Sequence, residues 1–259
     1  MKNIALKIEN LSVDYGKNSV LRDICLQIPE GEVLGIIGPN GGGKTTLLKS
    51  VLGIVKPKSG SIQVLGGSAS RNAHLIGYVP QHADVDRNFP INVVDTVVSG
   101  CIGGGIHPFG RYTKTQRLAA QDAMERVGIA DLANKNIGEL SGGQFQRMLI
   151  ARAIVSAPKI LFLDEPTASV DPASRESIYA LLGELKSDMT IVIVSHDLLA
   201  ISTLVESIAC LNGTLVYHGN PELTNEIMDE LYGCPVELIA HGVPHRVLHS
   251  HSHGEGCCH

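Results

Sequence analysis

A glycine-rich run, Gly38 to Thr45, has the residue types and the spacing that bind a phosphate group. It reads GPNGGGKT and fits the pattern G-x-x-x-x-G-K-[ST] between a predicted strand and a predicted helix. Glycines let backbone N–H groups turn toward phosphate oxygens, and the following helix adds the positive end of its dipole. Lys44 should reach the terminal phosphates of a nucleotide, and the Thr45 hydroxyl should ligate Mg²⁺. The nucleotide would contact Gly38, Pro39, Asn40, Gly41, Gly42, Gly43, Lys44, Thr45 and Thr46.

Two acidic residues follow a second apolar run, ILFL, and complete this chemistry. An aspartate at the carboxyl end of a core strand is where Mg²⁺ is held beside a phosphate loop, so Asp164 is the expected partner of Thr45. Glu165 comes next and is placed to polarise a water molecule for attack on the terminal phosphate. An acidic pair after a strand is weak evidence alone, but the phosphate loop makes it the expected partner.

The elements that must position these residues can be predicted from hydrophobic periodicity. Residues 4–28 alternate between apolar and polar and contain a turn at 15–19, which predicts an antiparallel hairpin. The middle of the chain, 91–155, has a mostly helical pattern. Further segments are predicted as strands at 33–37, 61–65, 75–79, 160–163 and 189–196, and as a helix at 45–52. Strands and helices on either side of a helical insert predict a parallel α/β core with a second lobe.

The composition excludes several classes of protein. Hydrophobic residues make up 44% of the chain and charged residues 18%, which favours a globular protein over a disordered one. The formal charge of −5 argues against a nucleic-acid binder. No apolar run approaches the roughly 20 residues of a membrane helix, and the first residues lack the apolar core of a signal peptide. We therefore expect a cytosolic protein whose six cysteines are reduced thiols.

The segment Leu140 to Gln144 reads LSGGQ, which would arise by chance in fewer than about one chain in a thousand. With this signature, the sequence resembles the ATP-binding subunits of ABC transporters from about residue 4 to 230. The resemblance implies an ATPase with a RecA-like P-loop NTPase core, an antiparallel β subdomain and a helical signature-motif subdomain. Ser141, Gly142, Gly143 and Gln144 would begin a helix and form an anion site. In the family this site faces the γ-phosphate held by the other subunit, which implies a head-to-tail homodimer around two ATP molecules.

Four further residues match family motifs in the family's order. Tyr15 stands where these proteins keep an aromatic residue that stacks on adenine. Gln81 matches the glutamine that joins the ATP site to the helical lobe and contacts Mg²⁺. Asp171 matches the loop between the two subunits, and His196 matches the histidine that contacts the γ-phosphate. Gly42 stands where many members have alanine or serine, which should loosen the phosphate loop slightly. The resemblance thus implies that catalysis depends on Glu165, His196, Gln81 and Lys44.

The same resemblance indicates partners and a transported substrate. The stretch at 79–100 and Phe145 after the signature resemble zinc and manganese uptake systems. We therefore expect an ATPase on the cytoplasmic face of the inner membrane that powers import of a divalent metal through a separate permease. A substrate-binding protein would be an indirect partner. The alternatives are a soluble ABC ATPase not coupled to transport, an importer for another substrate, and a metal-storing protein, although the last leaves the ATPase apparatus unexplained.

The predicted organisation has four parts: 1–88 and 157–232 form the ATP-binding core, 89–156 the helical subdomain, and 233–259 a tail. From residue 241 onward, the tail holds six of the eleven histidines and two of the six cysteines. Imidazole and thiolate ligate Zn²⁺, which makes this segment a candidate metal-binding regulatory or sensing element. Its candidate ligands are His249, His251, His253, Cys257, Cys258 and His259. A disordered solubilising tail, or an artificially added segment, is the alternative.

Overall fold

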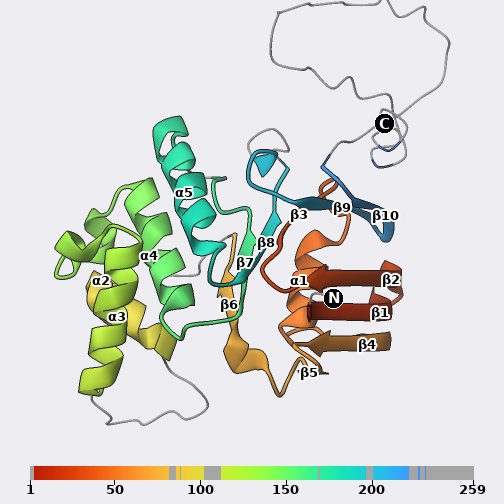
Figure 1. Cartoon of the computed structure of the whole chain (residues 1–259), viewed down its shortest axis with the longest axis horizontal. Coiled ribbons are helices and arrows are strands. Elements are labelled where there is room, and N and C mark those ends of the chain that lie inside the picture. The colour runs from red at the N-terminus through yellow and green to blue at the C-terminus, as the bar shows by residue number, and fades with distance from the viewer. Residues whose placement is uncertain are drawn as a thin grey trace, which may run out of the picture.

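Two β-sheets and a group of helices make up the protein (Figure 1). The structure is a computed structural model that describes residues 3–81, 86–87, 89–101, 112–168, 170–196, 201–221, 227 and 231. The antiparallel sheet has the order β2 (Asn18–Pro29), β1 (Ile4–Tyr15), β4 (Ser59–Val64), β5 (Gly67–Ser68). The larger sheet has the order β10 (Thr214–Gly219), β9 (Ser207–Asn212), β3 (Val33–Ile37), β8 (Thr190–Val194), β7 (Ile160–Asp164), β6 (Ile76–Val79). Its β9, β3, β8, β7 and β6 run parallel, which confirms the predicted fold class.

The central strands of the large sheet are buried on both faces. Every residue of β3, β7 and β8 is buried, as expected for parallel strands that are covered on both sides. Side chains such as Leu34 and Phe162 face the antiparallel sheet and α1 (Lys44–Val51). Their neighbours Val33 and Leu163 face the opposite way, into a cluster with the remaining helices. Because side chains alternate along each strand, the central strands contribute to two hydrophobic cores, one on each face of the sheet.

The helical part comes between β6 and β7 in the chain. It contains α2 (Val93–Val98), α3 (Lys114–Arg126) and α4 (Gly142–Ile154), which contact one another, and α4 also contacts α5 (Pro172–Leu185). Short 3-10 turns lie at Ala73–Leu75, Ser99–Cys101, Ala130–Leu132 and Ile137–Glu139. Figure 1 shows these helices grouped on one side of the sheet, away from β1 and β2. The limits of the four predicted parts stay a prediction.

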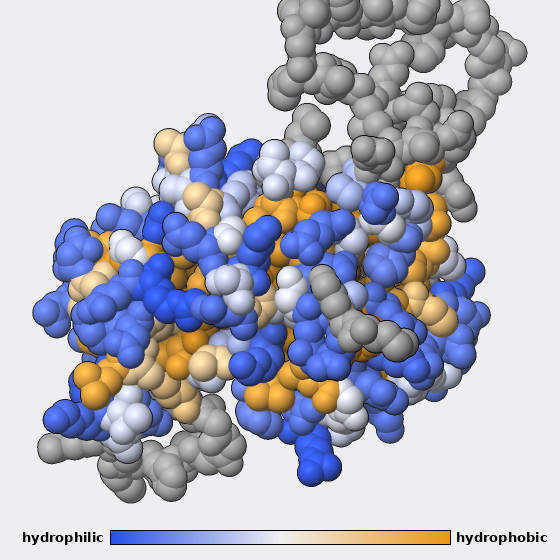
Figure 2. Space-filling model, in the orientation of Figure 1, coloured by the Kyte–Doolittle hydropathy of each residue, from blue (hydrophilic) through white to orange (hydrophobic). Residues whose placement is uncertain are grey.

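The surface carries few large apolar side chains. The exposed ones among the described residues are Tyr15, Ile54, Phe89 and Leu118. Figure 2 shows a mostly hydrophilic face on which apolar patches are small and separate. Across the part of the chain that the structure describes, no helix is both long enough and apolar enough to cross a membrane.

Candidate nucleotide-binding site

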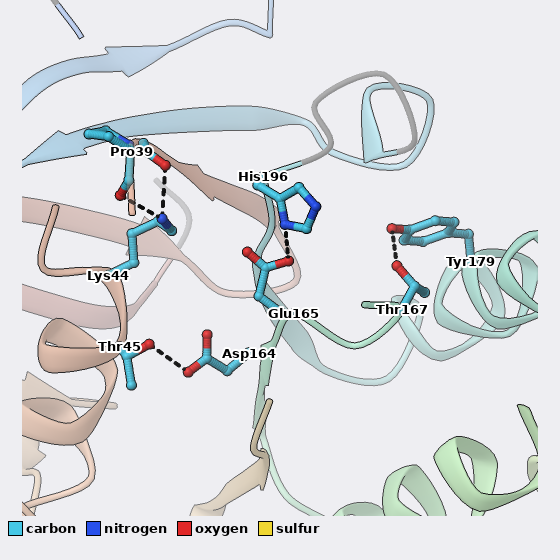
Figure 3. A network of polar contacts seen from close by, with 9 residues as sticks. Pro39, Lys44, Thr45, Asp164, Glu165, Thr167, Tyr179 and His196 are labelled. Atoms are coloured by element: carbon cyan, nitrogen blue, oxygen red, sulfur yellow. Dashed lines mark hydrogen bonds and ion pairs between the residues drawn. The ribbon is translucent and has the colours of Figure 1, made fainter. Parts of the chain in front are cut away.

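The parallel strands of the large sheet end at one edge, and the predicted phosphate chemistry stands on those ends. The glycine-rich loop follows β3, and Asp164 closes β7 with Glu165 directly after it. His196 comes two residues after β8, and Gln81 two residues after β6. Because β8 lies between β3 and β7, side chains far apart in the sequence meet at this edge (Figure 3).

The glycine-rich loop folds around the Lys44 ammonium group. Lys44 Nζ donates to the carbonyl oxygens of Gly38 at 2.8 Å and Pro39 at 3.0 Å (Figure 3). Gly43 has a φ of 94°, a left-handed conformation that glycine adopts without steric cost, and α1 begins at the next residue. Burial lowers the pKa of Lys44 from its ordinary value, while the carboxylates of Glu165 and Asp164 oppose that shift.

The turn between β9 and β10 braces this loop at Gly42. The Gly42 N–H donates to the Pro39 carbonyl at 3.0 Å, and the Gly42 carbonyl accepts from the Gly213 N–H at 2.9 Å. A Cβ at position 42 would stand 2.8 Å from the Leu211 carbonyl oxygen. The glycine therefore permits a close backbone contact beside the loop. The slight loosening expected from its missing side chain stays a prediction.

A cavity of about 210 Å³ opens beside the loop. It is lined by residues 40–46 together with Gln81, Asp164, Glu165 and Val20. Within it, Thr45 Oγ1 donates to Asp164 Oδ2 at 2.9 Å, and Asp164 is only 1% exposed. Val20, on β2, is the lining residue that sequence reasoning missed, because an apolar strand residue carries no chemical signal.

Glu165, which lines this cavity, forms a pair with His196, which is not among the lining residues. His196 Nδ1 lies 2.7 Å from Glu165 Oε2, and the Glu165 side chain is 9% exposed while that of His196 is 64% exposed (Figure 3). The Glu165 N–H donates to the Val194 carbonyl at 2.9 Å, which ties the end of β7 to β8. Glu165 has a φ of 50°, and such left-handed backbone in a residue other than glycine concentrates at functional sites.

The signature residues lie elsewhere, at the N-terminus of α4. Ser141 caps this helix: its Oγ accepts from the Gln144 N–H at 3.2 Å, and the Gln144 side chain accepts from the Ser141 N–H at 3.0 Å. This confirms that the signature begins a helix, and it gives Gln144 a capping role. Gly143 packs against α5, where a Cβ would meet Ser174 Cβ at 2.7 Å. Gly142 is the first helical residue, so its backbone lies in the turn whose N–H groups attract anions.

Two other predicted residues also stand outside the cavity. Asp171 caps α5 by accepting from the Ser174 N–H at 3.0 Å, and this backbone hydrogen bond is the main cause that lowers the pKa of its carboxyl group. Tyr15 ends β1 and is 50% exposed, on the hairpin that contributes Val20 to the cavity wall. The tail candidates, His249 to His259, lie outside the described residues.

The profile of the family described as "ABC transporter" matches residues 21–168, more than half of the chain. This chain belongs to the ABC transporter family. The ABC ATPase is 41% identical over 240 residues to a "Probable metal transport system ATP-binding protein" of Chlamydia trachomatis serovar D, which covers 91% of this chain and 92% of that protein. It is 41% identical over 231 residues to the "Manganese transport system ATP-binding protein MntB" of Bacillus subtilis, covering 88% and 92%. It is 37% identical over 232 residues to the "Zinc transport system ATP-binding protein TroB" of Treponema pallidum, covering 88% and 87%.

Solved structures agree with these sequence relatives. The ABC ATPase superposes with a TM-score of 0.78 and 31% identity on a chain described as "An inward-facing conformation of a putative metal-chelate type ABC transporter", with 90% of each chain covered. It superposes with a TM-score of 0.77 and 25% identity on a nucleotide-free ATP-binding cassette from an ABC transporter, covering 90% and 96%.

The side chains in the cavity of the ABC ATPase are of the kind that would hold Mg²⁺ beside nucleotide phosphates. A hydroxyl oxygen and a carboxylate oxygen that already lie 2.9 Å apart are hard ligands of the kind that Mg²⁺ prefers, and Gln81 offers an amide oxygen in the same cavity. Within the described ranges, no three His, Cys, Asp or Glu side chains gather to hold a metal by themselves. Mg²⁺ usually completes its coordination with substrate phosphates and water, so a site with few protein ligands suits it.

Proposed function

We propose that this ABC ATPase hydrolyses Mg-ATP in the cavity between the glycine-rich loop and the ends of β7 and β8. The observation that carries the proposal is the convergence of Lys44, Thr45, Asp164, Glu165 and His196 on one edge of the sheet. Backbone N–H groups of residues 40–46 and the Lys44 ammonium bind the phosphates. Thr45, Asp164 and Gln81 would hold Mg²⁺, which would neutralise phosphate charge.

Glu165 is the proposed general base. Its carboxylate is nearly buried, and it lies within reach of the cavity that receives the terminal phosphate. His196 contacts the same carboxylate at 2.7 Å and is proposed to orient Glu165. Its ring is exposed, and its proposed partner is the γ-phosphate. In this arrangement Glu165 takes the proton of the attacking water, and Lys44 stabilises the charge on the phosphate oxygens.

The signature residues are proposed to complete the ATP site of a second copy of the chain. Ser141, Gly142 and Gly143 form a capped helix N-terminus, a typical anion-binding turn, but they do not line the cavity that holds Lys44. A head-to-tail homodimer brings each of these turns to the other subunit's ATP, with Tyr15 stacked on the adenine and Asp171 at the subunit boundary. ATP that binds the closed dimer better than the open one shifts the population toward closure.

The proposed task of this ATPase is to power import of a divalent metal, such as manganese or zinc, through a separate membrane permease. Support comes from relatives named for manganese and zinc transport over about nine-tenths of this chain. The ATPase would then lie on the cytoplasmic face of the membrane, and a substrate-binding protein would act indirectly. Co-expression with candidate permeases and co-purification test this: a stable complex with a multi-span protein is expected, and its ATP-dependent uptake of Mn²⁺ or Zn²⁺ is then measured in vesicles. Purification without any membrane partner, together with full activity as a soluble dimer, would favour an ATPase not coupled to transport.

A second proposal concerns the tail. Its histidines and cysteines, His249, His251, His253, Cys257, Cys258 and His259, are proposed to bind Zn²⁺ or a similar divalent ion and to regulate or sense metal. The support is compositional, since six histidines and two cysteines fall within the last nineteen residues. The ion would have to organise the segment itself, because the spacing is not that of a fixed zinc motif.

A further inference from the structure

The short loop after β7 determines where the Glu165 carboxylate lies. Glu165 has a φ of 50°, which a glutamate rarely adopts and which persists only where the surrounding structure holds it. Upstream, the Glu165 N–H is held by the Val194 carbonyl at 2.9 Å. The backbone hydrogen bonds on the downstream side are longer: Ala168 N–H reaches the Glu165 carbonyl at 3.2 Å, and Val170 N–H reaches the Thr167 carbonyl at 3.3 Å. Both distances lie at or beyond the long end of the usual range for N–H···O hydrogen bonds. We therefore expect a side-chain contact to contribute to holding this loop.

That contact is between two hydroxyl groups. Thr167 Oγ1 and Tyr179 OH lie 3.0 Å apart, joining the loop to the middle of α5 (Figure 3). Thr167 is 8% exposed, so its hydroxyl is largely withdrawn from water. Tyr179 is half-buried and packs against the hydrophobic cluster that contains residues of α4 and α5. This packing restricts the movement of its ring.

A movement of Thr167 must also move the backbone of Glu165. Only Pro166 separates the two residues, and Pro166 is buried with a φ that its ring restricts. Releasing Thr167 from α5 would therefore relax the strained backbone at Glu165 and turn its carboxylate. The contact with His196 at 2.7 Å would change with it, since that distance depends on where the carboxylate points.

We propose that Tyr179 is a positioning residue for ATP hydrolysis: its phenol hydroxyl holds Thr167, and thereby the loop that aims Glu165 at the attacking water. The inference rests on the proposed role of Glu165 as the general base. Misplacement of a catalytic group by about 1 Å can cost about a hundredfold in rate. Loss of one supporting hydrogen bond should cost less, about fivefold in kcat. The affinity for Mg-ATP should change little, because the phosphate loop after β3 is untouched.

The test uses the full chain and five conservative variants. Tyr179→Phe and Thr167→Val each remove one hydroxyl while keeping the shape, and the double variant removes both. Thr167→Ser keeps the hydroxyl, so its kcat should stay close to the wild-type value, unlike that of Thr167→Val. Tyr217→Phe is the matched control. Tyr217 lies on β10, outside the site, and its hydroxyl donates to the Asn220 carbonyl at 3.1 Å. Steady-state ATPase kinetics give kcat and KM, and calorimetry gives the dissociation constant of Mg-ATP.

The expected result is a fall of about fivefold in kcat for Tyr179→Phe and for Thr167→Val, with a loss in the double variant smaller than the product of the two single losses, since both changes remove the contact between the two hydroxyl groups. KM and the dissociation constant should stay within about twofold of the wild-type values. The inference is overturned by a wild-type kcat in Tyr179→Phe, by additive losses in the double variant, or by a parallel loss of ATP affinity. Glu165→Gln is measured alongside. A wild-type kcat in Glu165→Gln would show that Glu165 is not the general base. A wild-type kcat in Tyr179→Phe, together with an inactive Glu165→Gln, would reject only the role of Tyr179.

Discussion

Replacing Gly143 by alanine should separate α4 from α5 and weaken the signature turn without touching the phosphate loop. The new Cβ would stand 2.6 Å from Ser174 Oγ and 2.7 Å from Ser174 Cβ. Carbon atoms in good contact lie about 3.5–4.0 Å apart, so the overlap with Ser174 Cβ is close to 1 Å. The Ser174 hydroxyl can rotate away, but its Cβ cannot, since the Ser174 backbone is held by Asp171 at 3.0 Å and by Ser177 at 3.1 Å. Such an overlap typically costs about 1–3 kcal/mol of stability.

The geometry around Ser174 also predicts which second change relieves the clash. Ser174→Ala removes the hydroxyl but leaves Cβ in place, so Gly143→Ala/Ser174→Ala should remain destabilised. Ser174→Gly removes both atoms and leaves Ser174 Cα at 3.9 Å from the new Cβ, which is ordinary contact. Urea unfolding of both single variants at position 174, of Gly143→Ala and of the two double variants gives the coupling free energies. We expect coupling of about 1 kcal/mol or more with Ser174→Gly, and much less with Ser174→Ala.

Function should follow the same pattern. Gly143→Ala should bind Mg-ATP as a monomer with wild-type affinity but hydrolyse it slowly, because the displaced signature turn no longer fits the other subunit's nucleotide. Rescue of hydrolysis by Ser174→Gly but not by Ser174→Ala would link the loss to this contact. An unchanged urea midpoint in Gly143→Ala, or equal rescue by both changes at position 174, would refute the reasoning.

Two further predictions concern the phosphate loop and the tail. Lys44→Ala should weaken binding of Mg-ATP, measured by calorimetry, because it removes the cation held over the loop by the Gly38 and Pro39 carbonyls; an unchanged dissociation constant would defeat it. Truncation after Ala240 should leave ATP hydrolysis intact and lose most of the bound zinc, and equal zinc stoichiometry in the truncated and full chains would show that the tail is not the binding segment.

The core of the fold was predictable because its signals are local. The five-residue strand Val33–Ile37 and the hairpin of β1 and β2 follow from runs of apolar or alternating residues. The signature helix begins where Ser141 caps it, as its residue types predict. The hairpin of β9 and β10 went unpredicted although Asn212–Gly213, a dipeptide typical of hairpins, stands where β9 ends and β10 begins.

Contacts between distant segments account for what the sequence could not reveal. The hydrogen bond that the phosphate loop receives at Gly42 comes from a turn about 170 residues later in the chain. Val20 lines the cavity only because β2 packs beside α1. The contact between Thr167 and Tyr179 joins a loop to a helix. No sequence motif predicts that these two hydroxyl groups meet. Such pairings arise from how elements pack, which periodicity does not encode.

The most direct test of the shared ATP site is the oligomeric state of Glu165→Gln, measured by light scattering with and without Mg-ATP. Hydrolysis in this variant should fall by about 10²–10⁴-fold, because the general base is lost while ATP still binds. The variant should therefore accumulate as a dimer only when Mg-ATP is present. Adding Ser141→Arg should return it to a monomer that still binds ATP, whereas Ser141→Ala, which loses the same helix cap without adding bulk, should dimerise far better. Dimerisation of Glu165→Gln/Ser141→Arg at the same ATP concentration as Glu165→Gln would contradict a site built from two subunits.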